Sequence, residues 1–161
     1  MAAKLTRDME EFLDALNRRE TRYLVVGAHA VNAYTEPRTT KDLDVWIEPT
    51  SENAGRAVAA MKDFGAPKFV LDEKTMADKD TFFILGHRDG PNRIDVLKEI
   101  PGVEFAACWE NRRLQVLDSV TFPIPSPTDL LTAKLAAGRH QDLADAEKLR
   151  VAIELEQRLE K

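Results

Sequence analysis

The sequence predicts an α+β fold: a mixed sheet flanked by helices, with a pair of helices at the C-terminal end. Two observations predict it. Apolar residues recur at helical spacing in the first and last segments, and at strand spacing or in short runs in several segments between them. The predicted order is helix, strand, helix, strand, helix, several strands and then helices, which is typical of a sheet with helices packed against it.

Length and composition indicate one domain. The chain has 161 residues, of which 43% are hydrophobic, and a chain of this length buries enough surface to fold without a metal or disulfide. We expect residues 1–125 to form the core and residues 126–161 to form a helical segment packed on it, within a single domain. A formal net charge of -5 excludes attraction of nucleic acid over the whole surface but leaves a local basic patch open.

The surroundings of the protein are also predicted from composition. The sequence contains no apolar run near 18 residues and no basic-then-apolar leader, and Cys108 is the single cysteine. These features favour a reduced, cytoplasmic setting with no membrane partner.

The N-terminal third alternates helices and strands. The segment Thr6–Glu20 has apolar residues at helical spacing behind a threonine that can cap a helix. Tyr23–Val26 is a short apolar run typical of a buried strand. A helix over Ala28–Tyr34 follows and ends before Pro37.

The next strand has two different faces. Leu43–Ile47 alternates apolar and other residues and ends before Pro49. A period of two places Asp42, Asp44 and Trp46 on the face opposite to the apolar one. Ser51, with Asn53, opens a helix that Gly65 is expected to end.

The remaining elements are shorter until the end of the chain. Two apolar runs predict an antiparallel pair of strands, Phe82–Leu85 and Ile94–Leu97, joined by a turn over 86–92. Beyond them we expect a short helix around Phe105–Trp109, a hairpin or edge strands at Leu114–Leu117 and Val120–Ile124, and two packed helices from Thr128 that break at Gly138.

Three aspartates are the strongest candidates for chemistry. Asp42 and Asp44 lie two residues apart on a strand, so their side chains point to one face and repel each other. Asp95 alternates with Ile94 and Val96 in the same way on a nearby strand. Mg²⁺ prefers carboxylate oxygens and phosphates, and it would offset this repulsion. The alternative is a pair of solvated carboxylates on the wet face of an edge strand.

Two neighbouring features suit phosphate. Gly27 and Ala28 join a strand to a helix, where small side chains let phosphate approach backbone amides. Arg38 and Thr39 come shortly before the aspartates, followed by Thr40 and Lys41. These side chains could bind phosphate oxygens or only solvate a loop.

The same stretches resemble the nucleotidyltransferase fold of the DNA polymerase beta superfamily. The chain is most similar to small bacterial nucleotidyltransferases related to the toxins of abortive-infection toxin–antitoxin systems. The resemblance covers most of the chain, through Val25–Asn32, Arg38–Val45, Glu52–Asn53, Phe64–Pro67, Arg93–Leu97 and Leu130–Leu149.

The resemblance implies roles for particular residues. It implies that Asp42, Asp44 and Asp95 bind Mg²⁺ or Mn²⁺ and that the turn at Gly27 holds a nucleoside triphosphate. Ala28 departs from the family pattern, which has glycine or serine there, so a hydroxyl contact to phosphate is absent and backbone amides have to serve.

The C-terminal helices contain a further set of charged residues. In the toxin relatives a lysine and an aspartate of this region join the active site, which points to Lys134 and Asp142, with Asp145 a weaker candidate. The alternative is that Lys134 and Arg139 form surface ion pairs with these aspartates.

Other residues favour structural roles. His29 follows the glycine turn but is typical of a packed histidine, His87 and His140 lack partners at zinc-ligand spacing, and Cys108 is expected to be a buried thiol. Trp46 could stack on a base or cover the core.

Rival enzyme classes fit less well. Metal-dependent glycosyltransferases with an Asp-x-Asp motif need a longer chain, and aspartyl-phosphate phosphatases need a hydroxyl residue where Trp46 stands. One glycine after the first strand does not satisfy the dinucleotide-binding motif.

The sequence therefore predicts a nucleotidyltransferase that moves a nucleoside monophosphate from a nucleoside triphosphate to an acceptor. Its catalytic residues would be Asp42, Asp44, Asp95 and Lys134, with Gly27, Ala28, Arg38, Thr39 and Asp142 binding the nucleotide. The acceptor could be RNA, a protein or a small molecule, and an antitoxin is a further possible partner. The alternative is a nucleotide- or partner-binding module of the same fold without turnover.

Overall fold

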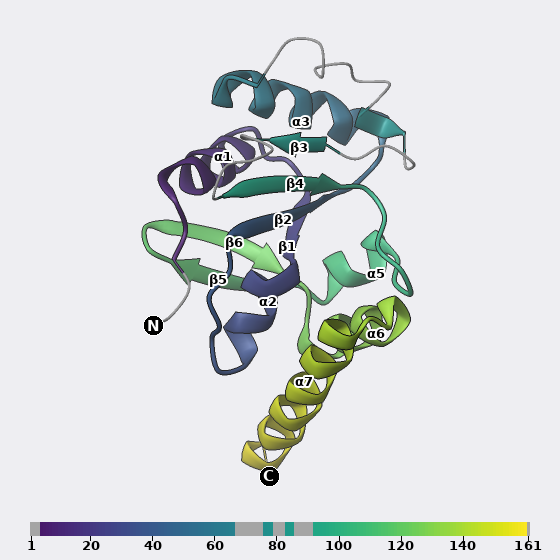
Figure 1. The fold of residues 1–161 in the computed structure, drawn as a ribbon. Helices are drawn as coiled ribbons and strands as arrows, with labels where there is room; N and C mark the ends of the chain where they lie inside the picture. Colours follow the sequence, from purple (N-terminus) through teal and green to yellow (C-terminus); the bar gives the residue numbers. More distant parts are fainter. Residues whose placement is uncertain (1–3, 67–75, 79–82, 86–91, 161) are drawn as a thin grey trace.

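A computed structural model describes residues 4–66, 76–78, 83–85 and 92–160. Their helices and strands follow one another in the predicted order (Figure 1). They are α1 (Arg7–Arg18), β1 (Tyr23–Val26), α2 (Gly27–Tyr34), β2 (Asp42–Ile47), α3 (Ser51–Phe64), β3 (Phe83–Leu85), β4 (Arg93–Leu97), α5 (Phe105–Glu110), β5 (Arg113–Leu117), β6 (Val120–Ile124), α6 (Pro127–Ala137) and α7 (His140–Leu159).

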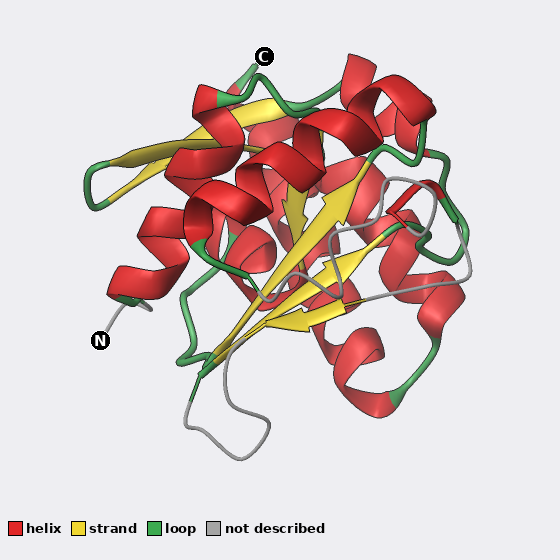
Figure 2. Cartoon of the chain, turned by 90° about the horizontal axis from the view of Figure 1, so that it is seen from above, coloured by secondary structure: helices red, strands yellow, loops and turns green. Residues whose placement is uncertain are grey.

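Four strands form a mixed sheet in the order β1-β2-β4-β3, seen from above in Figure 2. β1 pairs antiparallel with β2, β2 runs parallel to β4, and β3 pairs antiparallel with β4. The parallel pair sets Asp44 opposite Asp95. β5 and β6 form a separate antiparallel hairpin.

The two faces of the sheet are covered differently. Leu43, Val45 and Ile47 belong to the main apolar core, which also contains the buried faces of α1 and α3. A smaller apolar cluster on the other face includes Trp46 and Phe105, whose rings meet edge to face with centroids 5.1 Å apart. The aspartates of β2 and β4 share this second face, because side chains alternate along a strand.

Capping residues explain where several helices begin and end. Thr6 Oγ1 accepts a hydrogen bond from the backbone N–H of Met9 at the start of α1. The cap of α3 is Thr50, one residue before the predicted Ser51. Gly65 and Gly138 adopt positive φ angles of 93° and 71° at the ends of α3 and α6, conformations that glycine adopts without steric cost.

The structure confirms the fold class and the antiparallel pairing of β3 with β4. It also confirms the hairpin, the short helix at Phe105 and the break at Gly138. α6 begins at Pro127, one residue earlier than predicted, behind a cap from Ser126. Phe82, His87 and the turn over 86–91 lie outside the described residues.

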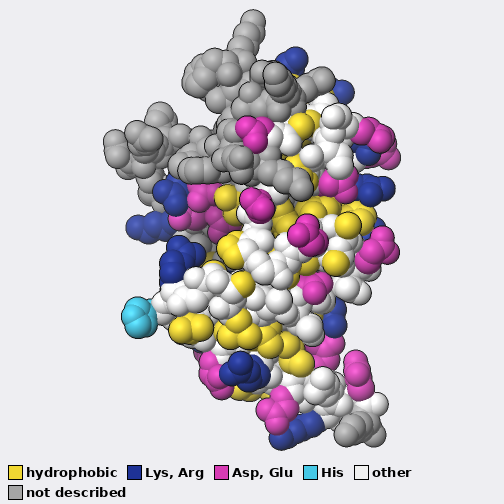
Figure 3. All heavy atoms as spheres, turned by 90° about the vertical axis from the view of Figure 1, so that its right-hand side faces the viewer, with side chains coloured by type: hydrophobic (Ala, Val, Ile, Leu, Met, Phe, Trp, Pro, Cys, Tyr) yellow, Lys and Arg dark blue, Asp and Glu magenta, His cyan; other side chains and the backbone are white. Residues whose placement is uncertain are grey.

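The C-terminal helices extend beyond the sheet, and α7 projects away from the rest of the chain in Figure 1. None of the helices in the described ranges is long and apolar enough to span a membrane. On the face shown in Figure 3, basic and acidic side chains are interspersed rather than gathered by sign.

Candidate functional site

Three aspartates of β2 and β4 lie together on one face of the sheet. Asp42 and Asp44 are two residues apart on β2, and Asp95 is the cross-strand partner of Asp44. The side chain of Asp42 is 43% exposed, whereas that of Asp95 is only 16% exposed. The predicted acidic cluster therefore forms through the parallel pairing of β2 with β4.

The turn at Gly27, at the start of α2, packs directly against the side chain of Asp44. Gly27 has a φ of +68°, and a Cβ placed on it would overlap Oδ2 of Asp44. Any side chain at this position would strain the backbone and displace the carboxylate. The absence of a side chain on Gly27 thus brings the start of α2 against the Asp44 carboxylate.

The surroundings of Asp44 disfavour its negative charge. Burial raises the pKa of Asp44 to about 6, and the negative charges of Asp95 and Asp42 act in the same direction. Lys134 partly offsets them. Asp44 is therefore the member of the cluster at which a further positive charge would be most stabilising.

Arg93 supplies a cation on the other side of the cluster. Its Nε lies 2.9 Å from Oδ1 of Asp95, and its Nη2 lies 3.7 Å from Oδ2 of Asp42. Arg93 is the cross-strand partner of Asp42 and lies two residues before Asp95 on β4. The sequence analysis missed this residue, although alternation along the strand places it on the face of Asp95.

The donor set fits a hard divalent cation, because Mg²⁺ binds carboxylate oxygens and phosphates. Burial and the two neighbouring carboxylates raise the pKa of Asp44, so a cation beside Asp44 would be stabilising. As the side chains stand, however, the described part of the chain contains no group of three or more His, Cys, Asp or Glu residues arranged to hold a metal ion.

A cavity of about 290 Å³ lies on the other side of Asp44. It extends from the sheet to α5, α6 and the start of α7, and its walls are mainly apolar. Gly27 and Asp44 line it together with Lys134, Arg139 and Asp142. The structure thus brings four predicted site residues, Gly27, Asp44, Lys134 and Asp142, around one cavity, together with Arg139.

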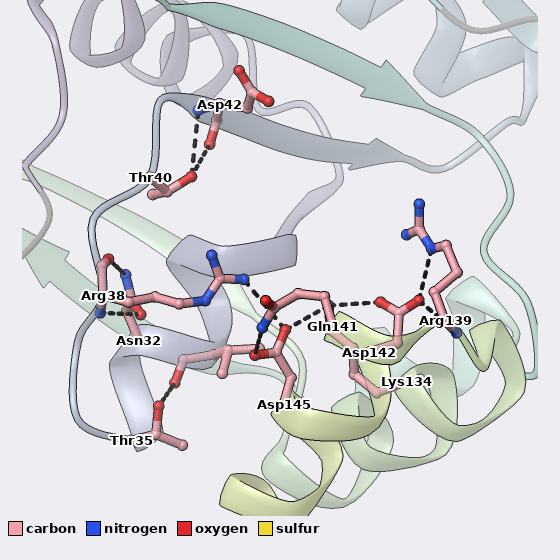
Figure 4. Close-up of polar contacts among 11 residues, drawn as sticks. Asn32, Thr35, Arg38, Thr40, Asp42, Lys134, Arg139, Gln141, Asp142 and Asp145 are labelled. Carbon is pink, nitrogen blue, oxygen red and sulfur yellow. Dashed lines mark hydrogen bonds and ion pairs between the residues drawn. The ribbon is translucent and has the colours of Figure 1, made fainter.

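A buried ion-pair network joins α6 to α7 beside this cavity (Figure 4). Lys134 Nζ lies 3.2 Å from Asp142 Oδ1 and 3.1 Å from Asp145 Oδ2. Arg139 Nε donates to Asp142 Oδ2 at 2.8 Å. Lys134 is 15% exposed and Asp142 and Asp145 are buried, so the pairs of Lys134 are not the surface ion pairs of the alternative interpretation. Arg139 is 83% exposed, so its pair with Asp142 lies at the surface, as that interpretation expects.

Hydrogen bonds and ion pairs hold both carboxylates of the network. Burial alone would raise the pKa of Asp142, but hydrogen bonds from Arg139 and Lys134 bring it below its usual value. Asp145 accepts a hydrogen bond from Gln141 at 3.0 Å and pairs with Arg38 at 3.4 Å. Lys134 therefore lies between two buried carboxyl groups and near Asp44.

Arg38 connects this network to the loop before β2. Asn32 holds the loop, because its amide donates to the carbonyl of Arg38 and accepts from the backbone N–H of Arg38. The guanidinium then reaches Asp145, 107 residues further along the chain. The sequence analysis ranked Asp145 below Asp142, yet Asp145 is the aspartate that joins α7 to this loop.

The other candidates are placed as follows. Thr39 is exposed, whereas Ala28 is half-buried directly after Gly27. His29 is 4% exposed, and burial lowers its pKa, as expected for a packed neutral histidine. Trp46 is buried against Phe105, which supports its role as a cover of the core. Cys108 is buried, and burial raises its pKa to about 12.

A comparison with family models finds one that spans almost the whole chain. The model describes a nucleotidyltransferase of unknown function (DUF6036), and it matches residues 3–159. The match includes all the residues of the acidic cluster and of the ion-pair network. No curated protein matches the chain.

We predict that Asp44→Asn stabilises the metal-free protein at pH 7.5. Because the pKa of Asp44 is raised from 3.8 to about 6, its ionised form costs stability above pH 6, and this cost disappears as the pH falls below 4. Removing the charge should add on the order of 2 kcal/mol to the free energy of unfolding, or about 4–8 °C in Tm. Thermal melts between pH 4 and 8 measure this.

The matched control is Asp14→Asn, an exposed carboxylate of α1, which should change Tm by less than about 2 °C. A lower Tm for Asp44→Asn at pH 7.5, or a difference that does not shrink toward pH 4, would contradict the assignment.

We also predict that Lys134→Met destabilises the fold. The change leaves Asp142 and Asp145 buried without the cation that lies 3.2 and 3.1 Å from them. Breaking a buried pair in this way costs about 3 kcal/mol, or roughly 6–12 °C in Tm. Lys148→Met, at an exposed position of α7, is the control, and equal Tm values for the two variants would refute the prediction.

Proposed function

The chain belongs to this family of nucleotidyltransferases of unknown function, and from that premise we propose that it is a Mg²⁺-dependent enzyme. In the proposed reaction an acceptor hydroxyl attacks the α-phosphorus of a nucleoside triphosphate, the bond between the α- and β-phosphates breaks, and the nucleoside monophosphate is transferred while pyrophosphate leaves. The observation that carries the proposal is the position of Asp44. Asp44 belongs to the acidic cluster and also lines a cavity that contains two basic residues, Lys134 and Arg139.

Asp42, Asp44 and Asp95 would hold the metal. When bound, Mg²⁺ neutralises negative charge on the phosphates during the transfer and on the carboxylates that bind it. In this proposal Asp95 also accepts the proton of the acceptor hydroxyl, since its side chain is the less exposed of the two that flank Asp44. Mn²⁺ has the same ligand preference and is the proposed substitute.

The nucleotide would occupy the cavity and its entrance. A volume of about 290 Å³ lies at the small end of ligand pockets, which span roughly 300–1,000 Å³. A phosphate is proposed to bind at the start of α2, whose first N–H groups have no partner within the helix. Lys134 and Arg139 add positive charge there, and Asp142 holds both side chains in place.

The loop before β2 completes the proposed phosphate site. Arg38 is engaged with Asp145, so its main proposed role is to fix α7 and Lys134 against the loop. Ala28 offers only its backbone amide, and the hydroxyl of Thr39 is exposed and free to reach a phosphate. Catalysis in such a site depends on positioning and charge neutralisation more than on covalent chemistry.

The acceptor in this proposal is RNA, a protein side chain or a small molecule carrying a hydroxyl. The interspersed charges in Figure 3 give no preference for nucleic acid on that face. A toxin role with an antitoxin partner, and a cytoplasmic location, remain predictions from the resemblance and the composition.

A second candidate is a nucleotide-binding module without turnover. One observation favours it: in the described residues the carboxylates are not gathered into a metal-binding arrangement. Such a module would bind nucleoside triphosphates, transfer nothing, and keep its nucleotide affinity in Asp95→Asn.

The proposed function predicts stabilisation by a nucleoside triphosphate that depends on Mg²⁺. Thermal melts with each of the four triphosphates, with and without Mg²⁺, measure it. A ligand at 100 times its Kd adds about 2.7 kcal/mol, or very roughly 5–11 °C for a chain of this size. The shift should be lost in Asp42→Ala/Asp44→Ala and kept in Asp14→Asn.

Transfer itself is then tested with the triphosphate that stabilises most, labelled at its α-phosphate, and with RNA, protein or small-molecule acceptors. Label in an acceptor with the wild type, but not with Asp95→Asn, supports the enzyme. A Mg²⁺-dependent shift without any transfer supports the module without turnover, and the absence of a shift with every triphosphate contradicts both.

A further inference from the structure

Arg93 lies against two of the three carboxylates of the acidic cluster. It pairs with Asp42 across the parallel strands and lies two residues before Asp95, so all three side chains leave the sheet on one face. Its guanidinium approaches Oδ2 of Asp42 and Oδ1 of Asp95, at 3.7 and 2.9 Å. One arginine thus bridges two of the three carboxylates.

The stronger of these contacts is incomplete. Arg93 Nε and Asp95 Oδ1 are closed to solvent and lie within hydrogen-bond distance, yet neither has a hydrogen bond of acceptable geometry among the described residues. Arg93 and Asp95 therefore form an ion pair without a well-oriented hydrogen bond. Charge-assisted hydrogen bonds with good geometry are about twice as strong as neutral ones, and this contact lacks that contribution.

The arginine also has a path away from the cluster. Its side chain is 42% exposed, as is that of Asp42 at 43%, so the guanidinium lies at the rim of the site. Long, exposed side chains change rotamer within nanoseconds. When the guanidinium of Arg93 moves away from Asp95, it loses no directed hydrogen bond and becomes hydrated.

We propose that Arg93 is an internal competitor of the divalent cation. In the metal-free protein the guanidinium lies against Oδ2 of Asp42 and Oδ1 of Asp95, and it leaves these oxygens when the metal binds. This inference rests on the proposed function, because it takes the three aspartates as the metal ligands.

The competition has a consequence for affinity. A metal ion and a guanidinium cannot contact the same carboxylate oxygens at once, so metal binding includes the displacement of Arg93. Removing the arginine should tighten metal binding to the protein without nucleotide by about fivefold, the effect of one unit charge about 4 Å away in water-like surroundings.

The test is a titration of the full-length protein with Mn²⁺, followed by electron paramagnetic resonance of the free ion. Arg93→Gln should lower the Kd for Mn²⁺ about fivefold relative to the wild type. Arg93→Lys keeps the charge, so its Kd for Mn²⁺ should be closer to that of the wild type. The control Arg150→Gln, on the exposed face of α7, should have the same Kd as the wild type. An unchanged or higher Kd in Arg93→Gln overturns the proposal.

A second measurement uses the wild type alone, in case Arg93→Gln does not fold. The Nε–H signal of Arg93 in nitrogen-15 spectra should shift on addition of saturating Mg²⁺ and exchange faster with water, because the group leaves a buried position. An unchanged signal at saturation overturns the proposal.

The two proposals fail in different ways. If Asp42→Ala/Asp44→Ala abolishes Mn²⁺ binding and Arg93→Gln does not tighten it, the metal site stands and the role of Arg93 falls. If Mn²⁺ binds to no variant, or binds equally well to Asp42→Ala/Asp44→Ala, both the metal-dependent function and the competition are refuted.

Discussion

Mutual repulsion among three carboxylates is the constraint on which the site depends. The parallel pairing of β2 with β4 sets Asp44 opposite Asp95, and Asp42 lies two residues away on the same face. Burial and these neighbours raise the pKa of Asp44 to about 6. A fold that held such a cluster without positive charge nearby would lose stability at neutral pH.

Positive charge reaches the cluster from two directions. Arg93 pairs with Asp42 and Asp95 at the rim, while Lys134 comes from α6 and acts on Asp44 from the cavity side. Lys134 is itself held by two buried aspartates of α7. The C-terminal helices are therefore part of the site, and their packing decides where its lysine lies.

Local patterns in the sequence predict the elements well, because alternation and capping depend on near neighbours. The period of two correctly places Asp42, Asp44 and Asp95 on faces of their strands. The same pattern contains Arg93, but its contact with Asp42 depends on the parallel register, which the sequence does not specify. The link from Arg38 to Asp145 spans 107 residues, and the burial of Asp142 follows from helix packing rather than from the spacing of charges.

The most direct test of the account is the location of a bound metal together with a nucleotide. In nuclear magnetic resonance spectra, Mn²⁺ added with a non-hydrolysable nucleoside triphosphate broadens the signals of nearby nuclei. The account predicts broadening centred on Gly27, Asp42, Asp44 and Asp95, extending to Lys134, and none in the last turns of α7. Broadening centred elsewhere, or unchanged spectra, would contradict it.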